Sequence, residues 1–201
     1  MSDNMKKKIF LLSIAILALT TLKSQDKIQF GIKGGANFTN MTSDMTSEVL
    51  IEKEYKIGFH TGVLVEIPFG DKFSLQPEIL YSTFGSKGKE ILCGGPNITT
   101  EYKLDYIQVP ILAKIYLYKG LSLEIGPSFN LLVNDKKIRE SNTISDIGKK
   151  FEFSGILGVS YKLSSGLIGS FRYTNSFTNA LNKDYFEINN YGFLVGIGYL
   201  F

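Results

Sequence analysis

The last strand that the sequence predicts ends with YGFLVGIGYLF, residues 191–201. Every second residue from Tyr191 to Phe201 is aromatic or aliphatic, and three of the five residues between them are glycine. A period of two is typical of a β-strand with two different faces, because successive side chains point to opposite sides of a sheet. Small residues on one face suit the crowded interior of a narrow barrel. The segment therefore predicts a barrel wall whose outer face is apolar.

The same alternation recurs along most of the chain, and no stretch after residue 24 keeps a helical period. We expect eight strands of about 10 to 16 residues, which is long enough to cross a bilayer at a tilt. They span Lys27 to Phe38, Tyr55 to Ile67, Lys72 to Phe84, Tyr102 to Leu117, Leu121 to Val133, Phe151 to Leu163, Leu167 to Phe177 and Asn189 to Phe201.

The connections between these strands alternate in length. Residues 68–71, 118–120 and 164–166 are short and contain the glycine of tight hairpin turns, whereas 39–54, 85–101, 134–150 and 178–188 are long and polar. Outer-membrane barrels place short turns on the periplasmic side and long loops on the cell surface. The fold class predicted is therefore all-β, an eight-stranded antiparallel transmembrane barrel.

The predicted inner face carries charges of both signs among glycines and serines. A soluble lipocalin-like barrel also alternates, but its polar face would point outward and carry mostly long solvated charges. We expect an ion-pair network in the lumen, in preference to catalytic carboxylate pairs. Its members would be Lys33, Glu66, Glu78, Lys114, Glu124 and Arg172.

Aromatic residues gather near both ends of the predicted strands, as they do at the two lipid interfaces of membrane barrels. The loop-end belt is expected to include Phe84 and Tyr106, and the turn-end belt to include Tyr116.

Composition excludes several classes of function. The formal net charge is +3, and four lysines against Asp3 already give +3 within residues 1–24, so the rest is neutral and shows no nucleic-acid footprint. One cysteine, Cys93, and one histidine, His60, leave no disulfide framework and no thiolate or multi-histidine metal site. No nucleophile motif accompanies His60, so we predict no catalytic, cofactor-binding or metal-binding residues and no enzyme activity.

The N-terminus reads as a secretory signal peptide over residues 1–24. Lys6 to Lys8 precede an apolar run, residues 9–22, and Ser24 is a small residue before a plausible cleavage site. A transmembrane helix needs about 20 apolar residues, and a buried core helix would not explain the basic start. The barrel domain would then occupy residues 25–201 and reach the bacterial outer membrane after export and cleavage.

Four segments resemble the PorT-like outer-membrane β-barrel family. They are FGIKGGANF at 30–38, LQPEILY at 75–81, LDYIQVPILAK at 104–114, and the glycine-rich strand at 191–201. Tyr199 and Phe201 also resemble the C-terminal signal that the barrel insertion machinery recognises.

The expected function is that of a non-enzymatic outer-membrane barrel. Such a barrel would anchor surface loops for envelope integrity or surface interaction, with outer-membrane lipid, the insertion machinery and a protein bound through the loops as partners. The alternative, which the family name suggests, is an accessory subunit of a protein secretion or assembly machine.

Overall fold

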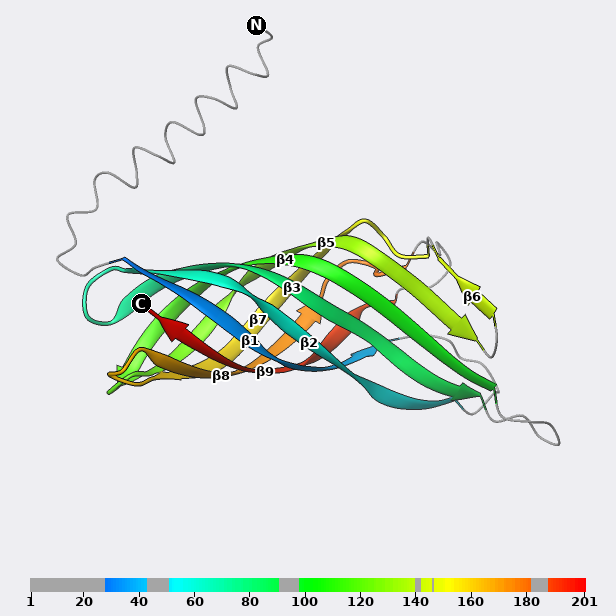
Figure 1. The fold of residues 1–201 in the computed structure, drawn as a ribbon, viewed down its shortest axis with the longest axis horizontal. Helices are drawn as coiled ribbons and strands as arrows, with labels where there is room; N and C mark the ends of the chain where they lie inside the picture. The colour runs from blue at the N-terminus through cyan, green and yellow to red at the C-terminus, as the bar shows by residue number, and fades with distance from the viewer. Residues whose placement is uncertain (1–27, 43–50, 91–97, 140–141, 146, 182–187) are drawn as a thin grey trace, which may run out of the picture.

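The computed structural model describes residues 28–42, 51–90, 98–139, 142–145, 147–181 and 188–201. These residues form one closed antiparallel β-barrel (Figure 1). The predicted signal peptide and Cys93 lie outside the described residues. Among the described residues, no helix is long and apolar enough to cross a membrane.

Eight strands form the barrel wall, as the alternation predicted. In chain order the strands are β1 Gln29–Met41, β2 Ile51–Pro68, β3 Phe73–Glu90, β4 Ile98–Tyr118, β5 Leu121–Arg139, β6 Asn142–Ile144, β7 Phe151–Lys162, β8 Leu167–Ser176 and β9 Asn190–Leu200. Neighbouring strands pair in the order β4-β3-β2-β1-β9-β8-β7-β5, and a β4–β5 pairing closes the ring. The short β6 pairs with the end of β5 alone and adds no wall strand.

The wall is much taller on one side than on the other. Strands β2 to β5 have 18 to 21 residues, whereas β7, β8 and β9 have 10 to 12. We call residues 51–55, 85–90, 98–103 and 134–139 the extension, because they continue the sheet beyond the mouth of the barrel (Figure 1). The sequence predicted polar loops over most of these residues, and that expectation was wrong: strand pairing continues there from Ile51↔Glu90 to Thr100↔Arg139.

Three tight turns join the strands at the opposite end. In the β4–β5 turn, both Lys119 and Gly120 have positive φ, 37° and 88°. A two-residue hairpin turn of type I′ requires positive φ at both positions, because its twist matches that of the strands it connects. The glycines predicted at these turns thus keep this end short.

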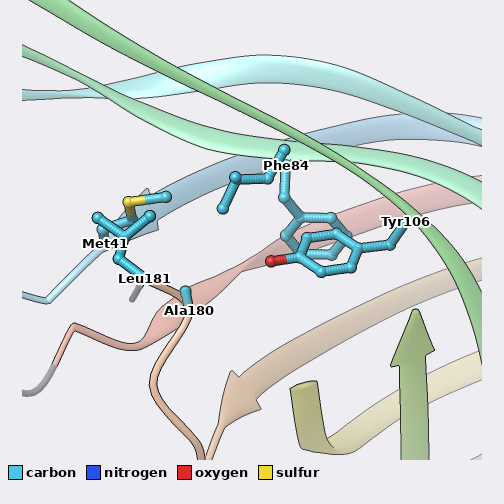
Figure 2. Packing of buried hydrophobic residues seen from close by; sticks show 6 residues of the cluster. Met41, Phe84, Tyr106, Ala180 and Leu181 are labelled. Atoms are coloured by element: carbon cyan, nitrogen blue, oxygen red, sulfur yellow. The ribbon is translucent and has the colours of Figure 1, made fainter. Parts of the chain in front are cut away.

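The two faces of the wall are sorted as the alternation predicted. Apolar side chains such as Ile197, 70% exposed, point outward, and polar side chains such as Gln108 point inward and are buried. A different set of residues was missed, namely inward apolar side chains that form a cluster at the loop end (Figure 2). Its buried members are Met41, Phe84, Leu104, Tyr106, Ala180 and Leu181.

Three aromatic residues were assigned to the wrong face. Phe84 and Tyr106 are buried inside the barrel, where their rings form a T-shaped, edge-to-face contact with centroids 5.9 Å apart. Tyr116 also points inward, since its hydroxyl donates to Glu66. Each shares the inward alternation of its strand with a polar neighbour, so position near a strand end did not decide its direction.

Glycine makes room for the buried ring of His60. A Cβ at Gly35 would lie 2.0 Å from the Val195 carbonyl oxygen and 2.6 Å from His60 Cε1. A Cβ at Gly196 would lie 2.9 Å from His60 Nε2. Small residues on the inner face are thus a steric requirement of this narrow barrel.

Candidate functional site

Arg172 lies at the centre of a charged cluster that fills the part of the lumen nearer the turn end. Its Nη1 and Nη2 donate to the two oxygens of Glu78 at 2.8 and 2.7 Å, and its Nε donates to Glu124 Oε2 at 2.6 Å. These three residues come from β8, β3 and β5. In the ring β3 and β8 lie opposite each other, and β5 lies two strands from each. A guanidinium held by two carboxylates is a strong and geometrically specific arrangement.

Lysines link the remaining carboxylate to this centre. Lys33 lies 3.7 Å from Glu78, and Lys114 lies 3.2 Å from Glu66 and 3.9 Å from Glu124. The structure therefore brings all six residues of the expected network into one connected cluster. Sequence reasoning did not pair three further residues with this cluster: Gln76, which accepts from Lys114 at 3.0 Å, and Tyr116 and Lys162, which both donate to Glu66.

The cluster carries more positive than negative charge. Lys162 joins it through Glu66 Oε1 at 3.3 Å, so that four cations face three carboxylates. We call these seven residues the lumen network: Lys33, Glu66, Glu78, Lys114, Glu124, Lys162 and Arg172. Burying a charge is costly unless it is paired and hydrogen-bonded, so the geometry stabilises most of them and leaves one positive charge in excess.

A second polar group lies closer to the loop end of the lumen. Glu152 accepts hydrogen bonds from Asn190 at 2.6 Å, from Asn130 at 3.2 Å and from the Tyr106 hydroxyl at 3.2 Å. No cation of the described ranges lies within ion-pair distance of this buried carboxylate, which is held by neutral donors. The sequence places Glu152 on the inner face but gives no sign of these partners.

The loop end of the lumen is covered by chain. Ala180 and Leu181, which follow β8, pack onto the apolar cluster (Figure 2). Lys149 N donates to Ala180 O at 2.9 Å, and Asp135 Oδ2 accepts from the backbone of Gly148 at 2.9 Å. The connection between β5 and β7 is thereby hydrogen-bonded to the connection between β8 and β9 over the mouth of the barrel.

The turn end, in contrast, is hollow. A cavity of about 710 Å³ opens between the three turns, and we call it the vestibule. Its lining is Gln29, Glu66, Pro68, Gly70, Asp71, Tyr116, Lys119, Gly120, Tyr161, Lys162, Leu163 and Ser164. The lumen network thus ends at an open space on this side.

The expected insertion signal lies on the outer face at the turn end. Tyr199 and Phe201 are exposed, with ring centroids 5.4 Å apart, and Phe201 N donates to Phe30 O at 2.8 Å. Their recognition by insertion machinery stays a prediction. In the part of the chain that the structure describes, no group of three or more His, Cys, Asp or Glu side chains could hold a metal ion.

Comparisons with known proteins agree with this architecture. Residues 23–182 match a family model described as an outer membrane protein beta-barrel domain, and no curated protein matches the chain. Neisserial surface protein A has a similar fold, with a TM-score of 0.58 at 13% identity, covering 88% of this chain and 100% of that one.

Two further solved barrels are similar at the level of fold. Ail, the attachment invasion locus protein of Yersinia pestis, gives a TM-score of 0.52 at 14% identity, covering 88% of this chain and 100% of its own. OprG from Pseudomonas aeruginosa gives 0.50 at 11% identity, covering 86% and 95%. Because the family model matches most of the chain, the chain belongs to the outer membrane protein β-barrel domain family and is a protein of the bacterial outer membrane.

Proposed function

We propose that this protein is a non-enzymatic barrel that holds a rigid sheet at the cell surface for contact with a partner. One observation carries the proposal: the lumen is filled with packed side chains, while the extension continues the wall beyond the mouth. Eight-stranded barrels have an interior that side chains can fill, so an open solute pore is disfavoured.

The extension is suited to display. It is made of paired strands, and its side chains include ion pairs such as Lys103 with Glu101 at 3.6 Å and Lys87 with Glu54 at 4.0 Å. A hydrogen-bonded sheet keeps its shape better than an irregular loop, and long connections of outer-membrane barrels face the outside. The solved structures of a Neisserial surface protein and of an attachment protein support the same class of role.

A second candidate is an accessory subunit of a secretion or assembly machine. The vestibule favours it, because that cavity opens at the turn end, where a periplasmic component could reach it. Assignment to the PorT-like group, on the four segments quoted above, belongs to this second proposal.

Shortening the ends of β2 and β3 in the extension tests the first proposal. Deleting residues 52–54 and 87–89 removes the β2–β3 pairs from Glu52↔Lys89 to Glu54↔Lys87 and the β3–β4 pairs from Lys87↔Glu101 to Lys89↔Thr99. The wall from His60↔Ser82 to the turn end stays intact. We expect the variant to reach the outer membrane and keep the heat-dependent gel mobility of a folded barrel. It should lose the proteins that a membrane-impermeant cross-linker attaches to the intact protein on whole cells. An unchanged set of cross-linked proteins would refute the surface role, and periplasmic partners recovered after gentle extraction would favour the second candidate.

We also propose that export removes residues 1–24. The basic start and the short apolar run support this, and the mature chain should begin at Gln25 or within a residue or two of it. Mass spectrometry of the protein from outer-membrane fractions measures the N-terminal residue directly. Recovery of a chain that still begins at Met1 would show that no cleavage takes place.

A further inference from the structure

The vestibule has no part in the display of a surface sheet, yet it has the dimensions of a binding site. Its volume of about 710 Å³ lies within the usual range of small-molecule pockets. Residues of the three turns line it together with Gln29 of β1 and Lys162 of β7. The chemistry of its floor decides what kind of ligand would fit.

The Glu66 carboxylate at the floor of the vestibule already accepts hydrogen bonds from protein donors. Glu66 is 2% exposed and accepts from the Tyr116 hydroxyl at 2.5 Å, from Lys162 at 3.3 Å and from Lys114 at 3.2 Å. Both of its oxygens therefore have donors. A cationic ligand would find no free carboxylate at this depth.

The ammonium of Lys162, in contrast, is available. Its side chain is 23% exposed, and it donates to Gln29 Oε1 at 2.5 Å and to Glu66 Oε1 at 3.3 Å. An ammonium has three N–H donors, so one has no acceptor among the residues that the structure describes. The floor of the vestibule thus offers a charged donor.

The electrostatics point the same way. The lumen network holds four cations against three carboxylates, and Lys162 is its member nearest to solvent. On the rim, Asp71 and Lys119 carry opposite charges and leave that excess uncompensated. A positive charge in a cavity with low-dielectric walls attracts an anion more strongly than the same charge on an open surface.

We propose that the vestibule binds an oxyanion, a carboxylate or phosphate group carried by a small periplasmic solute, through the Lys162 ammonium. The Gln29 amide and Lys119 lie in the same cavity and can supply further donors. This inference does not depend on the surface role proposed above. It gives the barrel a ligand site on the side opposite the extension.

Calorimetric titration of the folded protein in detergent at low ionic strength tests the site, with succinate and inorganic phosphate as separate probes. We expect binding of at least one probe, and the stronger one identifies the class of oxyanion. Lys162→Gln should weaken binding about tenfold or more, since a charge-assisted hydrogen bond contributes about 1.5 to 3 kcal/mol. Lys162→Arg should retain most of the affinity.

Two further variants keep the test decisive. Gln29→Glu places a carboxylate beside Lys162, so it should weaken binding to a similar extent without leaving a charge unpaired. Lys72→Gln, in the β2–β3 turn but outside the vestibule lining, should leave the affinity unchanged. The proposal is overturned if neither probe binds the folded protein, if Gln29→Glu binds as tightly as the native protein, or if Lys72→Gln loses as much affinity as Lys162→Gln.

Discussion

Replacing Arg172 by leucine is expected to lower the free energy of unfolding by about 3 to 5 kcal/mol. The guanidinium supplies three hydrogen bonds to Glu78 and Glu124, and both carboxylates are buried. Without it, two negative charges would remain in the lumen with only Lys33 and Lys114 near them. The loss therefore comes from the close hydrogen-bonding partner that both buried carboxylates lose, because Lys33 and Lys114 lie 3.7 and 3.9 Å from them. Lys114→Leu should have an effect of the same kind.

Lys136→Leu is the matched control. Lys136 lies on the extension with its side chain exposed, where a single charge contributes about 0 to 1 kcal/mol. Urea unfolding in lipid vesicles, followed by the far-ultraviolet signal of the strands, compares the three variants. Equal losses for Arg172→Leu and Lys136→Leu would contradict the structural importance that we assign to the lumen network.

Replacing Val195 by arginine should cost about 2 to 4 kcal/mol, the penalty for a long cation near the midplane of a bilayer. Val195 is 44% exposed on the outer face of β9, and its strand neighbours in register are Ala36 and Phe171. The adjacent Leu194 and Gly196 face the lumen, so the substitution tests the lipid face alone. The same vesicle unfolding assay measures the loss.

Val133→Arg provides the comparison for this second change. Val133 is exposed on β5, two residues beyond Leu131 toward the extension, so its arginine can reach the polar headgroups. A cost of about 0 to 1 kcal/mol is expected there. If the two arginines cost the same, the membrane is not centred where the exposed apolar band places it.

Alternation predicted the wall because lipid and lumen demand different side chains at every second residue. Alternation did not predict the extension, because the extension lies outside the lipid. Beyond the membrane the outer face meets water, so β2 to β5 continue through residues such as Lys87, Lys103 and Lys136 in place of an apolar outer face. Strand pairing there depends on partners along the sheet, which polarity does not reveal.

For the lumen, alternation predicts which side chains point inward but not how far along the barrel axis each of them lies. It put Lys33, Glu78 and Arg172 inside, and their opposite charges predicted that they pair. It could not show that no lysine of the described ranges lies within ion-pair distance of Glu152, because that depends on strand tilt and on irregular register such as that between Asp105 and Tyr106. For Phe84 and Tyr106, alternation with Ser82 and Gln108 predicts an inward direction, whereas their place near strand ends predicts the lipid interface. The structure follows the alternation.

Closure of the ring by β1 and β9 constrains the order in which the barrel can assemble. The first and last wall strands pair from Gly31↔Leu200 to Met41↔Asn190, so the ring stays open until the most distant parts of the chain meet. The central ion pairs are equally non-local, with sequence separations of 94 for Arg172 and Glu78 and 96 for Lys162 and Glu66. A fold with such high contact order forms slowly. An open sheet crossing the bilayer would expose these charges and its unpaired edges to hydrocarbon, so the strands must meet before the lumen loses its water.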